Sequence, residues 1–321
     1  MGLFHAKMGM GDVMNETLYA KTNKKINRLG FGAWQLNNSL WGTMSEEDGI
    51  ALVKKAINQG INFFDTAPGY GSGMSEIILG KAIKGHREAV VINTKLGHKA
   101  DGNTDFSVES LENQVKESLK RIDIKYLDSV ILHNPSRDIL EGKTTHFQVL
   151  SQIKQKGLIR AFGVSIDTYD ELETVLKNND IDVVEILFNV FFQGPSRAFK
   201  LAKDKGVSLI AKVPLDSGWL TGKYDEHATF TGIRNRWSKE VIHHRGLLVK
   251  QLKTITQSEN LTPYAVGFIL SYPEITTVIP GIKTFEQLHE FTTNDFIISD
   301  EIKQQMIDLY EREIKNNPLP W

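Results

Sequence analysis

A helix-like segment separates two short apolar runs near the middle of the chain: LDSVIL at residues 127–132, THFQVLSQIKQK at 145–156 and IRAFGV at 159–164. The outer runs are short and rich in Val and Ile, as strands are, whereas the middle segment repeats apolar residues at helical spacing. Strand, helix and strand in this order form the repeating unit of a parallel sheet. The fold therefore depends on how often this unit recurs.

The unit recurs along most of the chain. We expect eight strands, at residues 29–34, 61–64, 90–94, 127–132, 159–164, 183–188, 207–213 and 276–279. Helical segments lie between them, for example at 47–59, 108–122 and 169–176. Eight such units predict a single-domain (β/α)8 TIM barrel, although the count alone also permits an open doubly wound sheet. We expect the barrel domain at 17–321, a hairpin over 18–29 that plugs one end, and a loose extension at 1–16.

Composition excludes several classes of protein. The 321 residues carry 38 Lys and Arg against 39 Asp and Glu, and they include no Cys. A net charge of −1 argues against nucleic acid or an anionic membrane as a partner. Without Cys there can be no disulfide, zinc–thiolate site or iron–sulfur cluster, and we predict no metal site of another kind.

The chain shows no signal peptide, and no apolar run approaches the ~20 residues that span a bilayer. We therefore predict a soluble cytoplasmic protein.

Polar residues follow several of the predicted strands. Asp65 closes the run 61–64, Lys95 closes 90–94, and His133 closes 127–132. Tyr70 comes five residues after Asp65, in a loop. Because the carboxyl ends of all barrel strands meet at one face, these side chains should share a pocket. Taken singly, each has an ordinary structural explanation; together they indicate a catalytic site.

The four residue types suit proton transfer to a carbonyl. A free phenol has a pKa of about 10, and a neighbouring ammonium such as Lys95 favours the phenolate of Tyr70 and lowers that pKa. Asp65 would hold and balance the lysine, and His133 would orient the carbonyl. Tyr70 could then act as a general acid. Since no side chain donates hydride, a nicotinamide cofactor is implied.

Several segments resemble the aldo-keto reductase family in order and spacing over about residues 17–290. They are GFGAW at 30–34, FDTAPGYG at 64–71, TK at 94–95, LHNP at 132–135, FGVS at 162–165, GWLTGKY at 218–224 and IPGIK at 279–283. The resemblance implies a TIM barrel, bound NADPH, and a catalytic tetrad of Asp65, Tyr70, Lys95 and His133. The expected activity is reversible reduction of aldehydes or ketones to alcohols.

The resemblance also assigns cofactor-binding positions. Three would line the nicotinamide, namely Gly32, Ala33 and Trp34. Ser165 and Glu185 would contact its carboxamide, and Lys212 occupies the position of the residue that stacks on the ring. Six would contact the pyrophosphate and adenosine phosphate, namely Pro214, Leu215, Gly218, Gly281, Lys283 and Gln287. The substrate pocket is expected from aromatic residues, which could equally be core: Trp34, Trp41, Phe192, Trp219 and Trp237.

Three departures from the family pattern affect this site. Glu185 replaces the usual Gln, and Ile166 replaces an Asn, so one carboxamide contact is lost or moves to Asp167. Lys212 replaces the aromatic residue that commonly stacks on the nicotinamide. Strand alternation leaves two possibilities for Lys212: its charge reaches the ring, or Ala211 points inward and Lys212 points away.

A second reading of the resemblance is a regulatory protein. Potassium-channel β subunits share this fold and bind NADPH, so the chain could bind the cofactor with little turnover. The complete tetrad favours an enzyme. The expected partner is a small carbonyl substrate, and the expected state is a monomer or weak oligomer.

Overall fold

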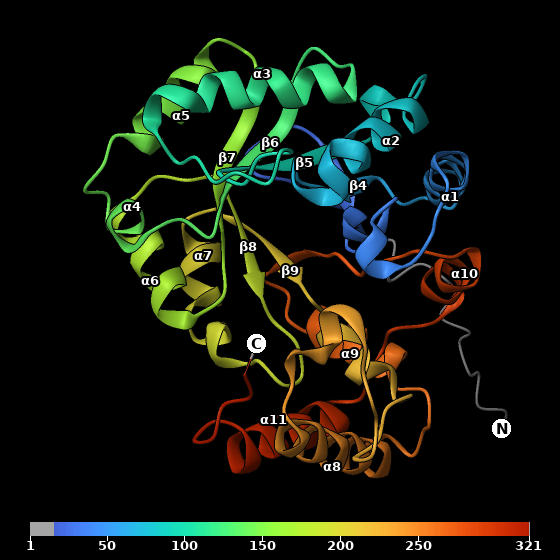
Figure 1. Ribbon diagram of the computed structural model, residues 1–321. Helices are drawn as coiled ribbons and strands as arrows, with labels where there is room; N and C mark the ends of the chain where they lie inside the picture. The colour runs from blue at the N-terminus through green and yellow to red at the C-terminus, as the bar shows by residue number, and fades with distance from the viewer. Residues whose placement is uncertain (1–15, 321) are drawn as a thin grey trace, which may run out of the picture.

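Eight parallel strands form a barrel at the centre of the molecule (Figure 1). The computed structural model describes residues 16–320, apart from the side chains of Trp41 and Ile233. The strands pair in chain order and are β3 (Phe31–Gly32), β4 (Phe63–Asp65), β5 (Val91–Leu96), β6 (Leu127–His133), β7 (Ile159–Ile166), β8 (Val183–Leu187), β9 (Ser208–Lys212) and β10 (Ile275–Val278).

The first and last strands of the barrel also meet. Parallel bridges join Leu29 to Val278 and Gly32 to Gly281, and Gly30 N donates to Val278 O at 2.8 Å. These contacts close the sheet, so the predicted TIM barrel is confirmed and the open doubly wound sheet is wrong. Residues 1–15 of the expected extension lie outside the described part of the chain.

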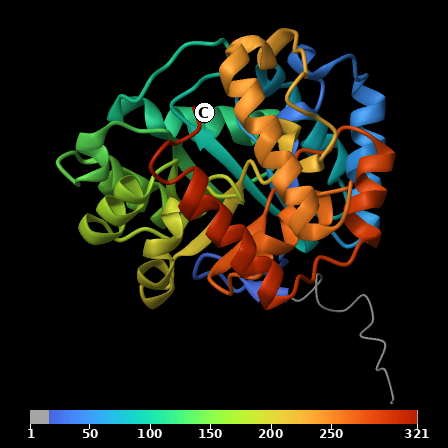
Figure 2. The ribbon, with the colours of Figure 1, turned by 90° about the horizontal axis from the view of Figure 1, so that it is seen from below.

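Helices surround the barrel as an outer layer (Figure 1). They are α1 (Glu46–Asn58), α2 (Met74–Ala82), α3 (Leu111–Ile122), α4 (Arg137–Leu140), α5 (His146–Gln155), α6 (Tyr169–Asn178), α7 (Phe199–Asp204), α8 (Lys239–Thr256), α9 (Thr262–Leu270), α10 (Phe285–Thr293) and α11 (Asp300–Glu313). Figure 2 shows α8 and α11 side by side. None of the helices in the described part has the length and apolar character that crossing a bilayer requires. The cytoplasmic location stays a prediction.

A β-hairpin closes the amino-terminal end of the barrel, as predicted, but it covers residues 16–27 and not 18–29, so residue 16 belongs to the hairpin and not to the extension. Its strands are β1 (Glu16–Leu18) and β2 (Lys25–Asn27), and Tyr19 in its turn is fully buried. The Tyr19 hydroxyl lies 2.6 Å from Ser129 Oγ, inside the barrel. Its ring packs edge-on against Phe63, with 5.2 Å between centroids. The hairpin thus fills one end and leaves the other for a pocket.

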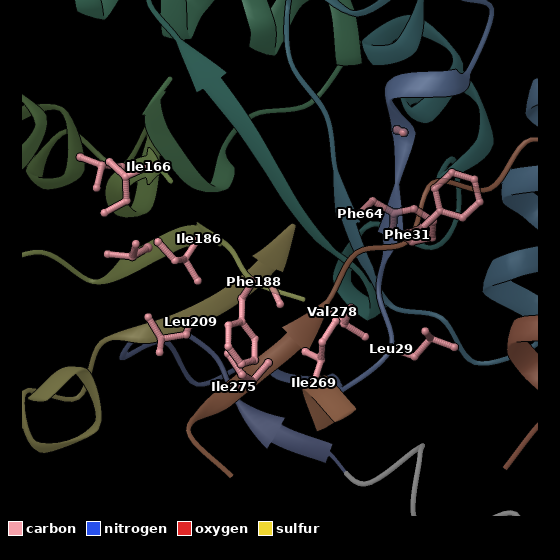
Figure 3. Close-up of a cluster of buried hydrophobic side chains, with 14 of the residues drawn as sticks. Leu29, Phe31, Phe64, Ile166, Ile186, Phe188, Leu209, Ile269, Ile275 and Val278 are labelled. Atoms are coloured by element: carbon pink, nitrogen blue, oxygen red, sulfur yellow. The ribbon is translucent and has the colours of Figure 1, made fainter. Parts of the chain in front are cut away.

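Strand alternation decides which side chains enter the barrel. Phe63 and Ile210 belong to the small cluster inside it. Their neighbours Phe64 and Ala211 belong to the larger core between strands and helices, part of which Figure 3 shows around Phe188. Because the side-chain period of a strand is two, Asp65 and Lys212 follow Phe63 and Ile210 to the inside.

Candidate active site

A cavity of about 520 Å³ lies at the carboxyl ends of the barrel strands. At its base are Asp65, which ends β4, Tyr70 from the loop after β4, and His133, which ends β6. Lys283 and Gln287 line it from the segment after β10. The cavity is therefore assembled from residues more than 200 positions apart in sequence.

The structure brings the four predicted tetrad residues together. Lys95 Nζ lies 2.5 Å from Asp65 Oδ2 and 5.1 Å from the centroid of the Tyr70 ring. The rings of Tyr70 and His133 meet edge to face, with 6.5 Å between their centroids. Lys95 is fully buried beneath the cavity, while the other three residues line it.

Local structure fixes two of these side chains. Asp65 ends β4, where Asn93 of the next strand donates from Nδ2 to Asp65 Oδ1 at 2.7 Å. Tyr70 begins a 3₁₀ turn (Tyr70–Gly73) in which Gly71 has a φ of 56°. A Cβ on Gly71 would lie 2.6 Å from Asn37 O, so only glycine fits this approach. The turn holds the phenol above Lys95.

Two carboxylates share the buried lysine. Besides Asp65, Glu185 Oε2 lies 3.2 Å from Lys95 Nζ. Burial lowers the pKa of Lys95, but the two carboxylates raise it more, so the lysine stays charged. Burial and the charge of Glu185 raise the pKa of Asp65 above its usual range. Burial also acts to raise the pKa of Glu185, but Lys95 and Lys212 hold it low. Of the two acids, Asp65 is the one held closer to protonation.

The pKa of Tyr70 differs from the sequence-based expectation. Burial raises the pKa of the phenol most, and the charges of Asp65 and Glu185 add to this; Lys95 lowers it only in part. The expected net lowering is therefore wrong for this structure, although Lys95 acts in the predicted direction. Burial and the Lys95 cation lower the pKa of His133 to about 3. At neutral pH the phenol carries its proton and His133 is neutral.

Lys212 points into the cavity. Its Nζ donates to Ser165 Oγ at 2.8 Å and lies 2.8 Å from Asp167 Oδ1. Ser165 in turn donates to Glu185 Oε1 at 3.1 Å. Ala211 packs in the core against the helices. The possibility that Ala211 points inward and Lys212 away is therefore wrong.

Three further cations line the cavity. They are Lys223, Arg234 and Lys283, and Arg234 Nε donates to Ser217 O at 2.8 Å. The predicted residues Gly32, Pro214, Leu215, Gly218, Gly281 and Gln287 line it as well. Cations together with carboxylates fit a dinucleotide, whose phosphates and carboxamide need such partners.

Some predicted site residues do not reach the cavity. Ala33 is fully buried, and its carbonyl accepts a hydrogen bond from Ser75 Oγ. Trp219 is also fully buried, and it packs edge-on against Trp237 with 5.8 Å between centroids. Phe192 packs against the core. Trp219 and Trp237 are wrong as pocket walls because tertiary packing buries them, and the half-buried Phe192 does not line the cavity either; Trp34, 6.0 Å from the Tyr70 ring, does line it. The side chain of Trp41 lies outside the described part.

The sequence analysis missed several lining residues. They include Gln35, His98, Asn134, Val213, Ser217 and Thr221. His98 could have been predicted as a lining residue, since it lies three residues after Lys95, near the end of the same strand. Arg234 could also have been predicted, because it belongs to a long segment between β9 and α8. Loops of that length commonly carry function.

Comparison with known proteins gives one consistent family. The family model described as "Aldo/keto reductase family" matches residues 28–306. The chain is 30% identical to "Aldo-keto reductase YhdN" of Bacillus subtilis over 86% of its own length and 87% of that protein. It superposes on the holo form of aldo-keto reductase AKR11C1 from Bacillus halodurans with a TM-score of 0.78 at 23% identity, covering 92% of this chain and 96% of the other. That likeness concerns the fold.

Two further relatives bear different functional names. "NADH-specific methylglyoxal reductase" of Escherichia coli is 27% identical over 84% of this chain and 90% of its own. "Probable voltage-gated potassium channel subunit beta" of Oryza sativa subsp. japonica is 24% identical over 93% of this chain and 96% of its own. Shared ancestry therefore leaves cofactor and role to be argued from the site.

Proposed function

Because the chain belongs to the aldo/keto reductase family, we propose that it is an NADP(H)-dependent oxidoreductase that reduces aldehydes or ketones to alcohols, reversibly. The observation that carries this proposal is the contact of 2.5 Å between Lys95 and Asp65 beneath a half-buried, protonated Tyr70. A regulatory binding protein has no need of a cation placed under a phenol.

Each tetrad residue has a part in proton transfer. Tyr70 holds the proton destined for the carbonyl oxygen, and its high pKa keeps it in the acid form needed for reduction. Lys95 lies 5.1 Å from the ring and lessens the cost of the phenolate left behind. Asp65 anchors that lysine. Neutral His133, edge-on to Tyr70, is suited to hydrogen-bond the same oxygen. A bound reduced nicotinamide would supply the hydride.

The cavity's own residues would hold that cofactor. Glu185 and Asp167 line the cavity and offer partners for the carboxamide, whereas Ser165, the predicted partner, is fully buried beside Glu185; the cations Lys283 and Arg234 would pair with the phosphates. We assign the preference for NADP(H) to Lys283, whose backbone N donates to Gln287 Oε1 at 3.0 Å. A cation there can pair with the 2′-phosphate, a contact worth roughly 1.5–3 kcal/mol.

The second candidate is a cofactor-binding regulator. The rice relative named as a channel subunit favours it, since that protein matches nearly its whole length. Such a protein would bind NADPH with little carbonyl-dependent consumption. The tetrad geometry supports turnover instead.

Replacement of Tyr70 by Phe tests the proposal. Tyr70→Phe keeps the ring beside Trp34 and Lys95 but removes the proton donor. We expect aldehyde reduction to fall about 10²–10⁴-fold, with NADPH affinity within threefold of the parent, measured by cofactor absorbance and by tryptophan fluorescence quenching.

Tyr126→Phe is the matched control. Tyr126 directly precedes β6, at the end of the barrel opposite the cavity, and its hydroxyl donates to Glu88 Oε2. This variant should turn over normally. Turnover of Tyr70→Phe within threefold of the parent would contradict the role of Tyr70, and NADPH binding without turnover of any carbonyl by the parent would favour the regulator.

A further inference from the structure

Three polar side chains share one layer of the barrel interior, at the base of the cavity. Asp65, Asn93 and Ser129 are register partners on the neighbouring strands β4, β5 and β6. All three are buried, and Asn93 and Ser129 are buried completely. Apolar side chains ordinarily fill the interior of such a barrel, and burial of a polar group is costly unless it is hydrogen-bonded. Asp65 belongs to the tetrad, whereas Asn93 and Ser129 have no part in it.

Hydrogen bonds join this layer to the plugging hairpin. Asn93 Nδ2 donates to Asp65 Oδ1 at 2.7 Å, and Ser129 Oγ donates to Asn93 Oδ1 at 2.6 Å. The Tyr19 hydroxyl of the hairpin lies 2.6 Å from Ser129 Oγ. The other carboxylate oxygen of Asp65 accepts from Lys95. We refer to Tyr19, Ser129, Asn93 and Asp65 as the interior network, which connects the hairpin at one end of the barrel with the tetrad at the other.

The direction of each hydrogen bond in the interior network follows from the Asp65 end. An ionised carboxylate only accepts, so the Asn93 amide presents its NH₂ group to Asp65 and its oxygen to Ser129. Ser129 has a single hydroxyl proton, which it donates to Asn93, so it accepts from Tyr19. Burial raises the pKa of Tyr19 well above its usual range, so its phenol retains the proton that it donates. Every donor in the network therefore points toward Asp65.

A donor directed at Asp65 favours its ionised form. Burial and the charge of Glu185 act in the opposite direction and raise the pKa of Asp65, while Lys95 lowers it. A hydrogen bond donated to the charged carboxylate lowers the pKa as well. The titratable groups around this site are Tyr19, Tyr70, Lys95, His133, Glu185 and Lys212. All of these remain in place when Asn93 is substituted.

We propose that Asn93 is a positioning residue that keeps Asp65 ionised, and that the rest of the interior network fixes the Asn93 amide for this task. This inference rests on the proposed function, in which ionised Asp65 anchors Lys95 below Tyr70. Asn93 is completely buried and acts only through Asp65. The hairpin that closes one end of the barrel thereby supports proton transfer at the other end.

Asn93→Leu tests the proposal without cofactor or substrate. The variant removes the donor while nearly preserving the volume of the side chain. The lost hydrogen bond stabilises mainly the ionised carboxylate, so it contributes to stability at high pH and contributes less as the pH falls and Asp65 takes up a proton. We therefore expect the difference in urea midpoint between the parent and Asn93→Leu to widen as the pH rises from about 5 to about 9.

The pH profile of aldehyde reduction gives a second measurement. Reduction should decline at low pH, because protonated Asp65 no longer anchors Lys95. A hydrogen bond to a charged group is worth about one to two pKa units, so the acidic limb of kcat/KM should move to higher pH by this amount in Asn93→Leu. Above that limb, kcat/KM should return to within threefold of the parent value. A purely structural defect would instead lower kcat/KM equally at every pH.

Thr94→Val is the matched control. Thr94 follows Asn93 on β5, is also completely buried, and donates to a carboxylate oxygen of Glu76 at 2.7 Å. Because successive residues of a strand face opposite sides, this contact lies on the helix side of the sheet. Thr94→Val thus loses a comparable hydrogen bond, and its acidic limb should stay at the parent position.

Ser129→Ala is the second test variant. It leaves Asn93 in place but removes the hydroxyl that fixes the amide, so the acidic limb should move in the same direction by a smaller amount. A constant difference in urea midpoint, or an acidic limb that does not move, would overturn the role of Asn93; if Asn93→Leu does not fold, the same measurements on Ser129→Ala decide. Failure of the parent to reduce any carbonyl would overturn the proposed function instead, while the urea measurement would still decide whether Asn93 keeps Asp65 ionised.

Discussion

Lys212 shows how one residue can change the chemistry of a shared fold. Its ammonium bridges Ser165 and Asp167 at the base of the cavity. The side chain is 13% exposed, so solvent screens it weakly. An oxidised nicotinamide is positively charged and the reduced ring is neutral. With the proposed cofactor bound so that its ring lies ~6 Å from this lysine, Lys212 would disfavour the oxidised form by about 3 kcal/mol at an effective dielectric of 20, and Asp167 would offset part of this.

Lys212→Tyr measures that effect. We expect NADP⁺ to bind more tightly relative to NADPH, since the variant removes the charge and restores a stacking ring. The dissociation constant of NADP⁺ divided by that of NADPH should fall at least fivefold, as determined by fluorescence titration. A ratio that changes less than twofold would contradict the electrostatic role. Lys205→Tyr, at an exposed position before β9, controls for a new aromatic side chain.

At the scale of elements, the segment after β9 depends on distant parts of the chain. Asp216, which begins the turn Asp216–Thr221, forms a salt bridge with Arg245 of α8, and both side chains are fully buried. Arg245 Nη2 also donates to Pro320 O at 2.7 Å. One guanidinium thus joins the cofactor-side turn, α8 and the end of the described chain. Ser217 and Gly218, next to Asp216, line the cavity.

Arg245→Met should therefore weaken both stability and the cofactor site. Removal of the cation leaves Asp216 buried without its partner, a loss of about 3–5 kcal/mol in the free energy of unfolding. Urea denaturation measures this loss, and NADPH titration should show weaker binding. The double variant Asp216→Asn with Arg245→Met should be more stable than the single variant, because no buried charge remains. Equal stability of Arg245→Met and the parent would rule out this function for the ion pair.

At the scale of the whole molecule, ligand binding and folding are coupled. The cavity draws on residues from β3 to α10, so a cofactor that fills it would contact both halves of the barrel. A ligand that binds only the folded state at 100 times its dissociation constant adds about 2.7 kcal/mol. For a chain of this size that corresponds to a shift of several degrees in Tm, at roughly 2–4 °C per kcal/mol.

We expect NADPH to raise Tm more than NADH at equal concentration. In Lys283→Ala this difference should vanish, because the cation assigned to the 2′-phosphate is gone, while the shift with NADH stays. Differential scanning fluorimetry with the four cofactor forms supplies the comparison. Equal shifts for NADPH and NADH in the parent, or a preference that survives in Lys283→Ala, would show that the phosphate is recognised elsewhere or not at all.

The sequence by itself determined the eight βα units, the plugging hairpin, the strand-end residues Asp65, Lys95 and His133, and Tyr70 in the loop after Asp65; the family resemblance favoured the closed barrel over an open sheet. It could do so because strands buried on both faces leave continuous apolar runs, and the carboxyl ends of parallel strands must share one face. These patterns are local in sequence, and because the strands pair in chain order, the order of the units along the chain also gives their order around the barrel. The proposed proton donor and the lysine beside it could therefore be identified from the sequence.

Only the tertiary structure decided which side chains meet the cavity and how they are charged. The sequence suggests both Trp34 and Trp219 as pocket residues, yet Trp219 is buried among other aromatic side chains and Trp34 lines the cavity. The pKa of Tyr70 depends on burial and on Glu185, a residue 115 positions away. The place of His98 depends on Phe106 and on the facing ring of His133. Desolvation and side-chain contacts arise between segments that are distant in sequence and meet only in the folded protein. They therefore cannot be predicted from composition or from residue spacing.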